Sequence, residues 1–407
     1  MRKHRQKKTS NAKRAGASSK KTKESKSGLT RVKVVGVGGG GGNAVSRMMA
    51  GERPRGVEFI SINTDAQDLD YATAHKKIYI GKALTRGLGA GMNPEIGKQA
   101  AEENRSEIGE ALEGADVVFI TAGMGGGTGT SGSAVVAEIA KEKGILTIAV
   151  VTKPFAFEGA QRMNIAQEGL SRLKEKVDAL VVIPNDRIFS LIDKDTPILK
   201  AFAVIDEILK QSVQAITELV NTPGIINVDF ADVKTVLKDA GTTLIGIGTA
   251  SGQDRAMKAV NVAVNSPLLE VSIEGAKGVV FSVAGSRDMK MSEINDIAKS
   301  ISANLDNSAR VIFGAYHDRS LKDKALRVTV IATGFNGVFT SQRPMIPTLF
   351  MAGDGNRKEM KPDLNQKEAK NEENLFEEKE KNQKIAALKA DKNESWEIPT
   401  FLRKKRK

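Results

Sequence analysis

Val32-Lys33-Val34-Val35-Gly36-Val37-Gly38-Gly39-Gly40-Gly41-Gly42-Asn43-Ala44 decides the fold of this chain. A β-branched run of the kind that forms a buried strand meets five consecutive glycines, and a helix-compatible segment follows at 44–50. A strand, a glycine turn and a helix in this order predict an anion site, because the first N–H groups of a helix are unpaired and glycine lets the backbone approach phosphate oxygens. The alternative, a flexible linker, is disfavoured because the strand meets the glycines with no spacer.

The composition bounds the class of protein. With 407 residues, 40% of them hydrophobic, the chain is long enough for two domains, and an aromatic content of 4% predicts aliphatic cores. The absence of cysteine excludes disulfides, thiolate metal sites and a cysteine nucleophile. No apolar run reaches the ~18 residues that a membrane span needs.

The net charge of +13 is concentrated in two tails. Residues 1–30 hold eleven Lys or Arg against one Glu, and residues 403–407 are all basic. The sequence between them is slightly acidic, so no specific nucleic-acid partner is expected. We predict that residues 1–30 form a disordered basic arm. Contact of this arm with anionic lipid or nucleic acid, and organelle targeting, are the alternatives.

Apolar runs alternate with stretches long enough for crossover helices from residue 31 onward. This pattern predicts a Rossmann-like, doubly wound α/β domain with a parallel sheet over residues 31–196, whose ligand binds beyond the carboxyl ends of the strands. The runs are 32–37, 59–62, 117–121, 146–151 and 180–183.

A long helix and a smaller domain are predicted next. Apolar residues recur every three or four positions across 197–222, which predicts a central helix that ends at Thr222-Pro223-Gly224. Residues 223–336 read as an α+β domain, with strands expected at 243–249, 278–284, 310–314 and 327–333.

The C-terminal part of the sequence is polar until its last residues. Residues 337–394 are rich in Lys, Glu and Asn and are predicted to be a disordered linker. Residues 395–407 hold the only Trp, Trp396, a short apolar peptide and the basic terminus. An apolar peptide on a disordered tether is typical of a docking motif.

A second glycine-rich turn follows the 117–121 run and precedes a predicted helix at 133–142, and Gly87-Leu88-Gly89-Ala90-Gly91 supplies a third. Three such turns in one α/β domain favour a di- or triphosphate ligand. The hydroxyls of Thr128 and Thr130 suit phosphate oxygens or a Mg²⁺ shell. The sequence contains no Gly-x4-Gly-Lys-Ser/Thr motif, so main-chain amides are expected to hold the phosphates.

The dinucleotide fingerprint Gly36-x-Gly38-x-x-Gly41 is also satisfied, which leaves a nicotinamide oxidoreductase as an alternative. Almost any run of five glycines satisfies it, and a nicotinamide domain does not need the second turn. The three histidines, His4, His75 and His317, show no ligand spacing, so no metal-ligating side chains are assigned.

The motifs taken together resemble the FtsZ family, the tubulin-like cell-division GTPases, over residues 31–334. The resemblance rests on Gly38-Gly39-Gly40-Gly41-Gly42-Asn43, Gly89-Ala90-Gly91, Gly125-Gly126-Gly127-Thr128-Gly129-Thr130 and Asn227-Val228-Asp229-Phe230-Ala231-Asp232. It implies a tubulin/FtsZ-like fold, in which a GTPase domain is joined by a long central helix to a smaller α+β domain.

The resemblance also implies a set of GTP-binding residues. Those near the phosphates would be Gly39, Gly40, Gly41, Gly42, Asn43, Ala44, Gly91, Gly126, Gly127, Thr128, Gly129 and Thr130. Those near the ribose, phosphates and base would be Glu158, Arg162, Asn185, Phe202 and Asp206. Without the resemblance, Glu158 and Arg162 read as a surface salt bridge, Phe202 as core and Asp206 as a first-turn acid.

Phe202 and Asp206 carry a physical reason for guanine. An aromatic ring can stack on a purine, and a carboxylate accepts from guanine N1–H and its 2-amino group, which adenine does not offer. Two positions depart from the family pattern. Ser131 follows Thr130 where glycine is usual, and Ile205 stands where a small residue is usual.

Asn227, Asp229 and Asp232 are the candidate catalytic residues. An amide and two carboxylates at this spacing could orient and polarise a water or hold a cation, as phosphoanhydride hydrolysis requires. They follow a helix of roughly 24 residues, about 36 Å long, that leads away from the nucleotide. The resemblance implies that they act on the nucleotide of the next subunit, so that hydrolysis accompanies head-to-tail polymerisation.

We therefore expect a cytoplasmic GTPase that uses GTP and Mg²⁺ and forms filaments at the division site beneath the membrane. The peptide residues Ile398, Pro399, Phe401 and Leu402 would bind membrane-tethering and regulatory division proteins, and the basic tails would contact anionic lipid. An alternative is a non-catalytic cytoskeletal homologue that keeps GTP as a structural ligand.

Overall fold

A computed structural model gives the fold of the chain. It describes residues 29–50, 56–193, 195–222, 224–266, 273–303, 305–306, 308–318, 321–322 and 324–335. The basic arm up to residue 28, the predicted linker and the terminal peptide with Ile398, Pro399, Phe401 and Leu402 lie outside the described residues. None of the described helices is long and apolar enough to cross a membrane.

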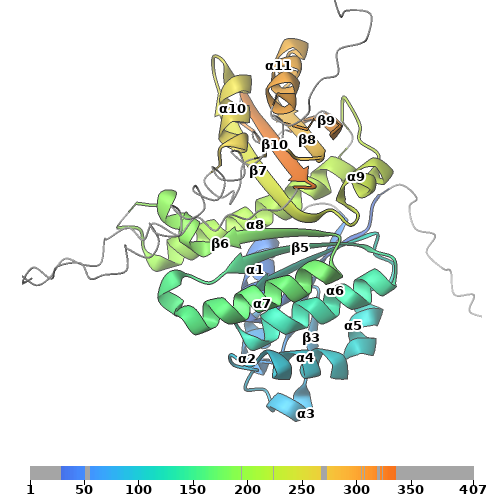
Figure 1. Cartoon of the computed structure of the whole chain (residues 1–407), viewed down its shortest axis with the longest axis vertical. Coiled ribbons are helices and arrows are strands. Elements are labelled where there is room, and N and C mark those ends of the chain that lie inside the picture. Colours follow the sequence, from blue (N-terminus) through green and yellow to red (C-terminus); the bar gives the residue numbers. More distant parts are fainter. Residues whose placement is uncertain are drawn as a thin grey trace, which may run out of the picture. The chain divides into compact units, whose positions relative to one another are not determined.

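Six parallel strands form the first part of the sheet (Figure 1). They are β1 (Val32–Val37), β2 (Val57–Asn63), β3 (Lys76–Tyr79), β4 (Val117–Gly123), β5 (Leu146–Lys153) and β6 (Ala179–Pro184). Their order, β3-β2-β1-β4-β5-β6, reverses direction between β1 and β4. The predicted doubly wound sheet is confirmed, and its switch point lies between the two strands that glycine-rich turns follow.

Eleven α-helices are described. They are α1 (Gly38–Ala50), α2 (Ala66–Tyr71), α3 (Lys82–Thr85), α4 (Pro94–Glu103), α5 (Arg105–Leu112), α6 (Ser133–Glu142), α7 (Ala160–Lys176), α8 (Ile198–Asn221), α9 (Phe230–Leu237), α10 (Arg255–Val264) and α11 (Met291–Ser302). Short turns of other helix types lie at Thr128–Gly132, Ala156–Glu158 and Asn185–Ser190.

Helices cover both faces of the parallel sheet, because inner strands such as β1, β4 and β5 are buried on both sides. Val35 belongs to a core that also holds Leu112 of α5 and Leu173 of α7, so α4 to α7 cover that face. Val34 belongs to a second core with Met48 of α1 and Leu209 of α8. Burial on both faces explains why the strands appear in the sequence as continuous apolar runs.

The glycine run after β1 departs from the predicted structure. The sequence predicts a turn followed by a helix at 44–50, but α1 begins at Gly38, so the glycines form its first turns. The helix lies directly on the sheet: a Cβ on Gly41 would lie 2.4 Å from the carbonyl oxygen of Thr121, and a Cβ on Gly36 would lie 2.3 Å from that of Gly41. Tertiary packing thus overrides the low helix propensity of glycine.

Helix α8 has 24 residues and runs along one face of the sheet, close to the predicted bounds. Ile205, Leu209 and Val213 are buried in the core beneath it. At its end, the side chain of Asn221 accepts from the backbone N–H of Thr30 (2.9 Å) and donates to the Thr30 carbonyl (3.1 Å). Because Thr30 precedes β1, α8 ends at the amino edge of the parallel strands.

The second part of the sheet comprises β7 (Gly241–Ser251), β8 (Gly278–Gly285), β9 (Arg310–His317) and β10 (Ala325–Thr333). Strand β10 pairs antiparallel with β7 and β8, and β9 pairs parallel with β8 at the edge. Alternate residues face two cores: Phe281 packs with α10 and α11, and Val280 packs with α8 and α9. A short pairing of β6 with β7 joins the two parts.

Candidate functional site

Three glycine-rich segments meet at the carboxyl ends of β1 and β4. Gly38 has a φ of +72°, and a Cβ on it would lie 2.9 Å from the amide nitrogen of Gly129. A Cβ on Gly127 would lie 2.5 Å from the carbonyl oxygen of Asn93, and the Gly127 N–H donates to the Gly91 carbonyl at 2.7 Å. The backbones approach more closely than any side chain would allow, so the three predicted turns form one cradle.

The cradle suits a polyphosphate. The amino end of α1 and the start of the turn that leads into α6 both lie there, and helix amino ends carry unpaired N–H groups and positive partial charge. The surface is main chain rather than side chain, because Gly39, Gly40 and Gly126 add no side-chain atoms. In α1 the N–H groups of residues 38–41 have no partner within the helix, and the phosphate contacts of the predicted residues stay a prediction.

The two threonines of the second turn make hydrogen bonds within the protein. The Thr128 hydroxyl lies 2.6 Å from that of Thr64, and the Thr130 hydroxyl accepts from the Gly125 N–H at 2.8 Å. Both side chains are buried, and each hydroxyl has room for a further hydrogen bond, so their contact with phosphate or Mg²⁺ stays a prediction. Ser131 lies in the same helical turn, Thr128–Gly132, and does not have a positive φ, so serine is tolerated where the family usually has glycine.

Glu158 and Arg162 form an ion pair at 3.1 Å next to the second turn. A Cβ on Gly125 would lie 2.7 Å from Cγ of Arg162, so the stem of the arginine packs against the glycine turn while 42% of its side chain stays exposed. Its Nε is buried and has no hydrogen-bond partner within the described residues. The same is true of Oδ1 of Asn185, which is 9% exposed. Buried polar atoms without protein partners are expected where a polar ligand binds.

Phe202 and Asp206 lie on one face of α8, one turn apart. Phe202 is 39% exposed, and its ring stands edge-on to Phe155 with centroids 5.8 Å apart, so it is not a core residue. The Asp206 carboxylate forms an ion pair with Arg47, on α1, with 2.9 Å between Oδ2 of the acid and Nε of the arginine. Burial raises the pKa of Asp206, and the Arg47 charge opposes that rise.

Two further side chains near Asp206 bear on this site. Ile205, which stands where the family usually has a small residue, is 5% exposed and packs into the core under α8. Arg47 was missed by the sequence analysis. The only available signal was its place four residues after Asn43, which puts both side chains on the same face of α1.

We call residues 224–232, which hold Asn227, Asp229 and Asp232, the acidic loop. It lies just after α8. Asn227 Oδ1 accepts from the Gly224 N–H at 2.6 Å, and Ile226 forms an antiparallel bridge with Ala315 of β9. Asp229 precedes the first residue of α9 and Asp232 lies in its first turn. Both carboxylates are exposed, and no hydrogen bond or ion pair joins them to another described residue. The loop is fixed by its backbone, and its acids are free.

The acidic loop and the glycine cradle lie at opposite edges of the parallel strands. The cradle follows the carboxyl end of β1, whereas Asn221, at the end of α8, is bonded to Thr30 at the amino end of β1. Helix α8 is about 36 Å long from its 24 residues. A single chain therefore does not bring Asp229 or Asp232 to its own cradle.

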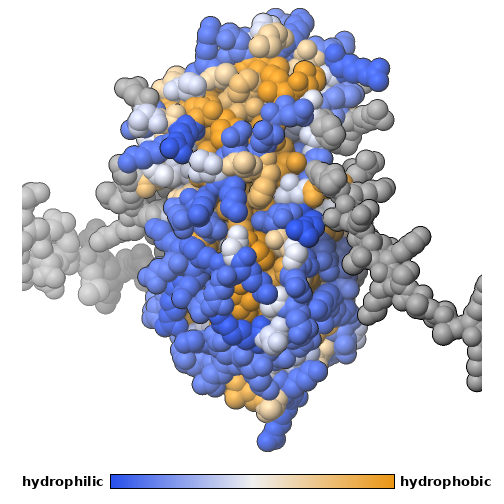
Figure 2. All heavy atoms as spheres, turned by 90° about the vertical axis from the view of Figure 1, so that its right-hand side faces the viewer, coloured by the Kyte–Doolittle hydropathy of each residue, from blue (hydrophilic) through white to orange (hydrophobic). Residues whose placement is uncertain are grey.

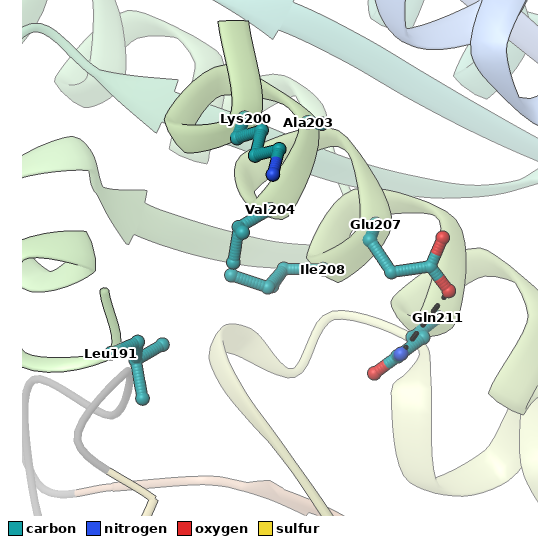
Figure 3. Close-up of a pocket in the computed structure, with 7 residues that line it drawn as sticks. All are labelled: Leu191, Lys200, Ala203, Val204, Glu207, Ile208 and Gln211. Atoms are coloured by element: carbon teal, nitrogen blue, oxygen red, sulfur yellow. Dashed lines mark hydrogen bonds between the residues drawn. The ribbon is translucent and has the colours of Figure 1, made fainter. Parts of the chain in front are cut away.

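A cavity of about 500 Å³ lies on α8 but is separate from this site (Figure 3). Its lining residues are Leu191, Lys200, Ala203, Val204, Glu207, Ile208 and Gln211. In Figure 3 the side chains of Val204 and Ile208 lie together, and Glu207 is hydrogen-bonded to Gln211 at 3.2 Å. The cavity lies on a different face of α8 from the buried Ile205 and Leu209 and contains no part of the glycine cradle.

The described residues contain no group of three or more His, Cys, Asp or Glu side chains that could hold a metal ion. Within the described part of the chain, two histidines bond to the backbone. Nδ1 of His75 accepts from the Phe59 N–H at 2.9 Å, and Nδ1 of His317 lies 2.9 Å from the Gly285 carbonyl.

Comparisons with known proteins agree with this geometry. The family model "Tubulin/FtsZ family, GTPase domain" matches residues 31–193, and "FtsZ family, C-terminal domain" matches residues 241–336. A solved FtsZ dimer from M. jannaschii is 48% identical, with 75% of this chain and 88% of that chain covered and a TM-score of 0.70. CetZ2 from Haloferax volcanii, a GTPγS-bound protofilament, has the same fold at 22% identity, with 75% and 94% covered and a TM-score of 0.65.

Proposed function

This chain belongs to the FtsZ family of tubulin-like GTPases, and from that premise we propose that it polymerises head to tail, each active site being completed by the acidic loop of the next subunit. GTP binding and hydrolysis are properties of the family. The proposal adds the assembly, the source of the catalytic acids and the cellular role.

The observation that carries the proposal is the separation of two half-sites. The glycine cradle and the acids Asp229 and Asp232 lie at opposite edges of the same sheet. The acids are exposed, and no described residue neutralises them. A second copy that docks its acidic loop over the cradle supplies what one copy lacks. Because the two docking surfaces differ, the contact repeats and produces an open filament.

In the assembled site, the cradle amides hold the phosphates, and Arg162 and Asn185 satisfy their buried polar atoms on the nucleotide. Asp229 and Asp232 of the next subunit orient the attacking water and accept its proton, and Asn227 is held in place by its bond with Gly224. Mg²⁺, when bound, neutralises charge on the phosphate oxygens. Phe202 stacks on the base, and Asp206 accepts from the guanine edge.

Exposed apolar side chains flank both half-sites, as a protein contact requires. Ile225, on the acidic loop, is 71% exposed, and Val311 and Phe313 of the neighbouring β9 are 41% and 37% exposed. Figure 2 shows apolar side chains gathered over the upper part of the molecule on the side that carries β9 and α9. On the cradle side, Leu88 and Phe157 are 85% and 71% exposed.

The filaments would act at the division site beneath the membrane. The peptide with Ile398, Pro399, Phe401 and Leu402 would bind membrane-tethering and regulatory division proteins. The basic residues 403–407 would add attraction to anionic lipid of about 1 kcal/mol per charge near the surface. Deleting 395–407 is expected to leave GTP turnover unchanged while abolishing recruitment to the division site, as observed by fluorescence microscopy.

The central test mixes two defective variants. Asp232→Ala keeps an intact pocket, and Asp206→Ala keeps an intact acidic loop. Each alone is expected to hydrolyse GTP poorly, but in a random equimolar copolymer about a quarter of the junctions combine an intact pocket with an intact loop. Glu175→Ala, an exposed acid on α7, serves as the control and should behave like the unmodified protein. Absence of rescue in copolymers of folded variants would contradict the shared site.

A further inference from the structure

We propose that Arg47 determines the guanine specificity of this GTPase, by holding the carboxylate of Asp206 in the orientation that reads the base. The inference rests on the proposed contact between Asp206 and the guanine edge. The inference adds Arg47 to the site, a residue that lies outside the glycine-rich segments and on α1, whereas Asp206 lies on α8.

The first step is the arrangement of two helices. Asn43 and Arg47 are four residues apart on α1, and Phe202 and Asp206 are four residues apart on α8. Both helices begin at the carboxyl edge of the parallel strands, α1 after β1 and α8 after β6 and the turn Asn185–Ser190. The pair of Arg47 with Asp206 therefore lies one turn beyond Asn43 on α1 and one turn beyond Phe202 on α8, and the proposed contact with the base lies at this pair.

The second step is the form of the ion pair. Nε of Arg47 contacts Oδ2 of Asp206 at 2.9 Å, and no hydrogen bond joins Oδ1 of Asp206 to a described residue. One carboxylate oxygen is thus anchored and the other can accept from a ligand. Asp206 is the more buried partner, with a side chain 13% exposed against 42% for Arg47. The more exposed arginine thus pairs with an acid that is mostly shielded from solvent.

The third step is the chemistry of recognition. Guanine presents N1–H and a 2-amino group, both donors, to an ionised carboxylate. Hypoxanthine lacks the amino group, and xanthine carries a 2-oxo acceptor that an anion repels. Burial raises the pKa of Asp206 and the Arg47 charge opposes that rise, so loss of Arg47 removes both the anchor of the carboxylate and a charge that favours its ionised form. A carboxylate without its anchor no longer presents a fixed acceptor to the two guanine donors. Losing Arg47 should therefore reduce discrimination as well as affinity.

The test compares the binding of GTP, ITP and XTP by competition against a fluorescent GTP analogue, at protein concentrations below assembly. Arg47→Gln is expected to reduce the preference for GTP over XTP about tenfold, roughly 1.4 kcal/mol. Arg47→Lys keeps the positive charge and is expected to restore part of the preference. Arg172→Gln, which removes an exposed arginine of α7 from a weak pair with Glu168, is the matched control and should retain the full preference.

Unchanged GTP:XTP and GTP:ITP ratios in folded Arg47→Gln protein would overturn the inference and leave Arg47 as a structural link between helices. Should Arg47→Gln fail to fold, Arg47→Met takes its place, and unchanged ratios in folded Arg47→Met protein overturn the inference equally. Asp206→Asn separates this inference from the proposed function on which it rests. If that variant also keeps the ratios, the base contact of Asp206 itself is wrong.

Discussion

The glycine cradle and the acidic loop are held in contrasting ways. In the cradle, backbones pack against each other at distances that exclude a Cβ, and the nearby polar groups are buried. The acidic loop is fastened to β9 through main-chain bonds at Ile226, but Asp229 and Asp232 remain exposed. The difference is what the proposed shared site requires, because the glycine cradle belongs to one chain and the acids are presented outward to another.

The largest effect is expected from removing a catalytic acid. Asp232→Ala should lower assembly-dependent GTP turnover by about 10²- to 10⁴-fold, because positioned acid–base groups contribute on that scale. The Kd for GTP should stay unchanged, since the acid lies at the other edge of the sheet. Phosphate release and nucleotide binding measure the two quantities separately. Weaker GTP binding together with normal turnover would contradict the separation of binding in the cradle from catalysis by the acidic loop.

The cradle should respond in the opposite way, through folding and binding. A Cβ on Gly41 would lie 2.4 Å from the Thr121 carbonyl oxygen, so Gly41→Ala is expected to cost about 1–3 kcal/mol of unfolding free energy and to weaken GTP binding. Gly109→Ala, in α5, would meet only ordinary contacts of 3.4 Å or more and should not destabilise the protein. Urea unfolding compares the two, and equal stabilities would contradict the packing argument.

The acidic loop pairs with β9, and the hydrogen bonds between β9 and α8 can be removed by substitution. The Tyr316 hydroxyl on β9 donates to Glu218 of α8 at 2.7 Å, and Arg327 also donates to Glu218 at 3.0 Å. Tyr316→Phe should therefore cost about 0.5–1.5 kcal/mol of stability, because Arg327 still pairs with the acid. The bonds between Ile226 and Ala315 are main-chain bonds, so GTP turnover should fall by less than in Asp232→Ala. If GTP turnover falls by more than the loss of folded protein explains, the hydrogen bonds among Tyr316, Glu218 and Arg327 have a catalytic role.

The smallest effect concerns pH and the buried acid at the base pocket. The pKa of Asp206 is raised by burial, so the folded state binds this proton more tightly than the unfolded state does. Stability from this group therefore decreases as pH rises from the unfolded pKa through the folded one. Asp206→Asn lacks this penalty, and its thermal stability relative to the unmodified protein should increase over that window. If the difference in thermal stability between Asp206→Asn and the unmodified protein stays constant with pH, burial does not control the ionisation of Asp206.

Much of the fold follows from local sequence patterns. The β-branched runs and the glycine turns after β1 and β4 predict the parallel sheet and its ligand edge, because strand burial and turn chemistry are encoded by neighbouring residues. The apolar periodicity across 197–222 likewise predicts bounds close to those of the 24-residue helix α8. The family motifs supply the candidate residues at both ends of that helix.

Only the tertiary structure decided which of those residues meet. It began α1 at Gly38, turned the hydroxyl of Thr130 inward, paired Arg47 with Asp206 and placed the acidic loop at the amino edge of the strands. These features depend on contacts between residues that are distant in the sequence. A local pattern fixes the period of a helix or strand, whereas the partner of a side chain is fixed by how whole elements pack.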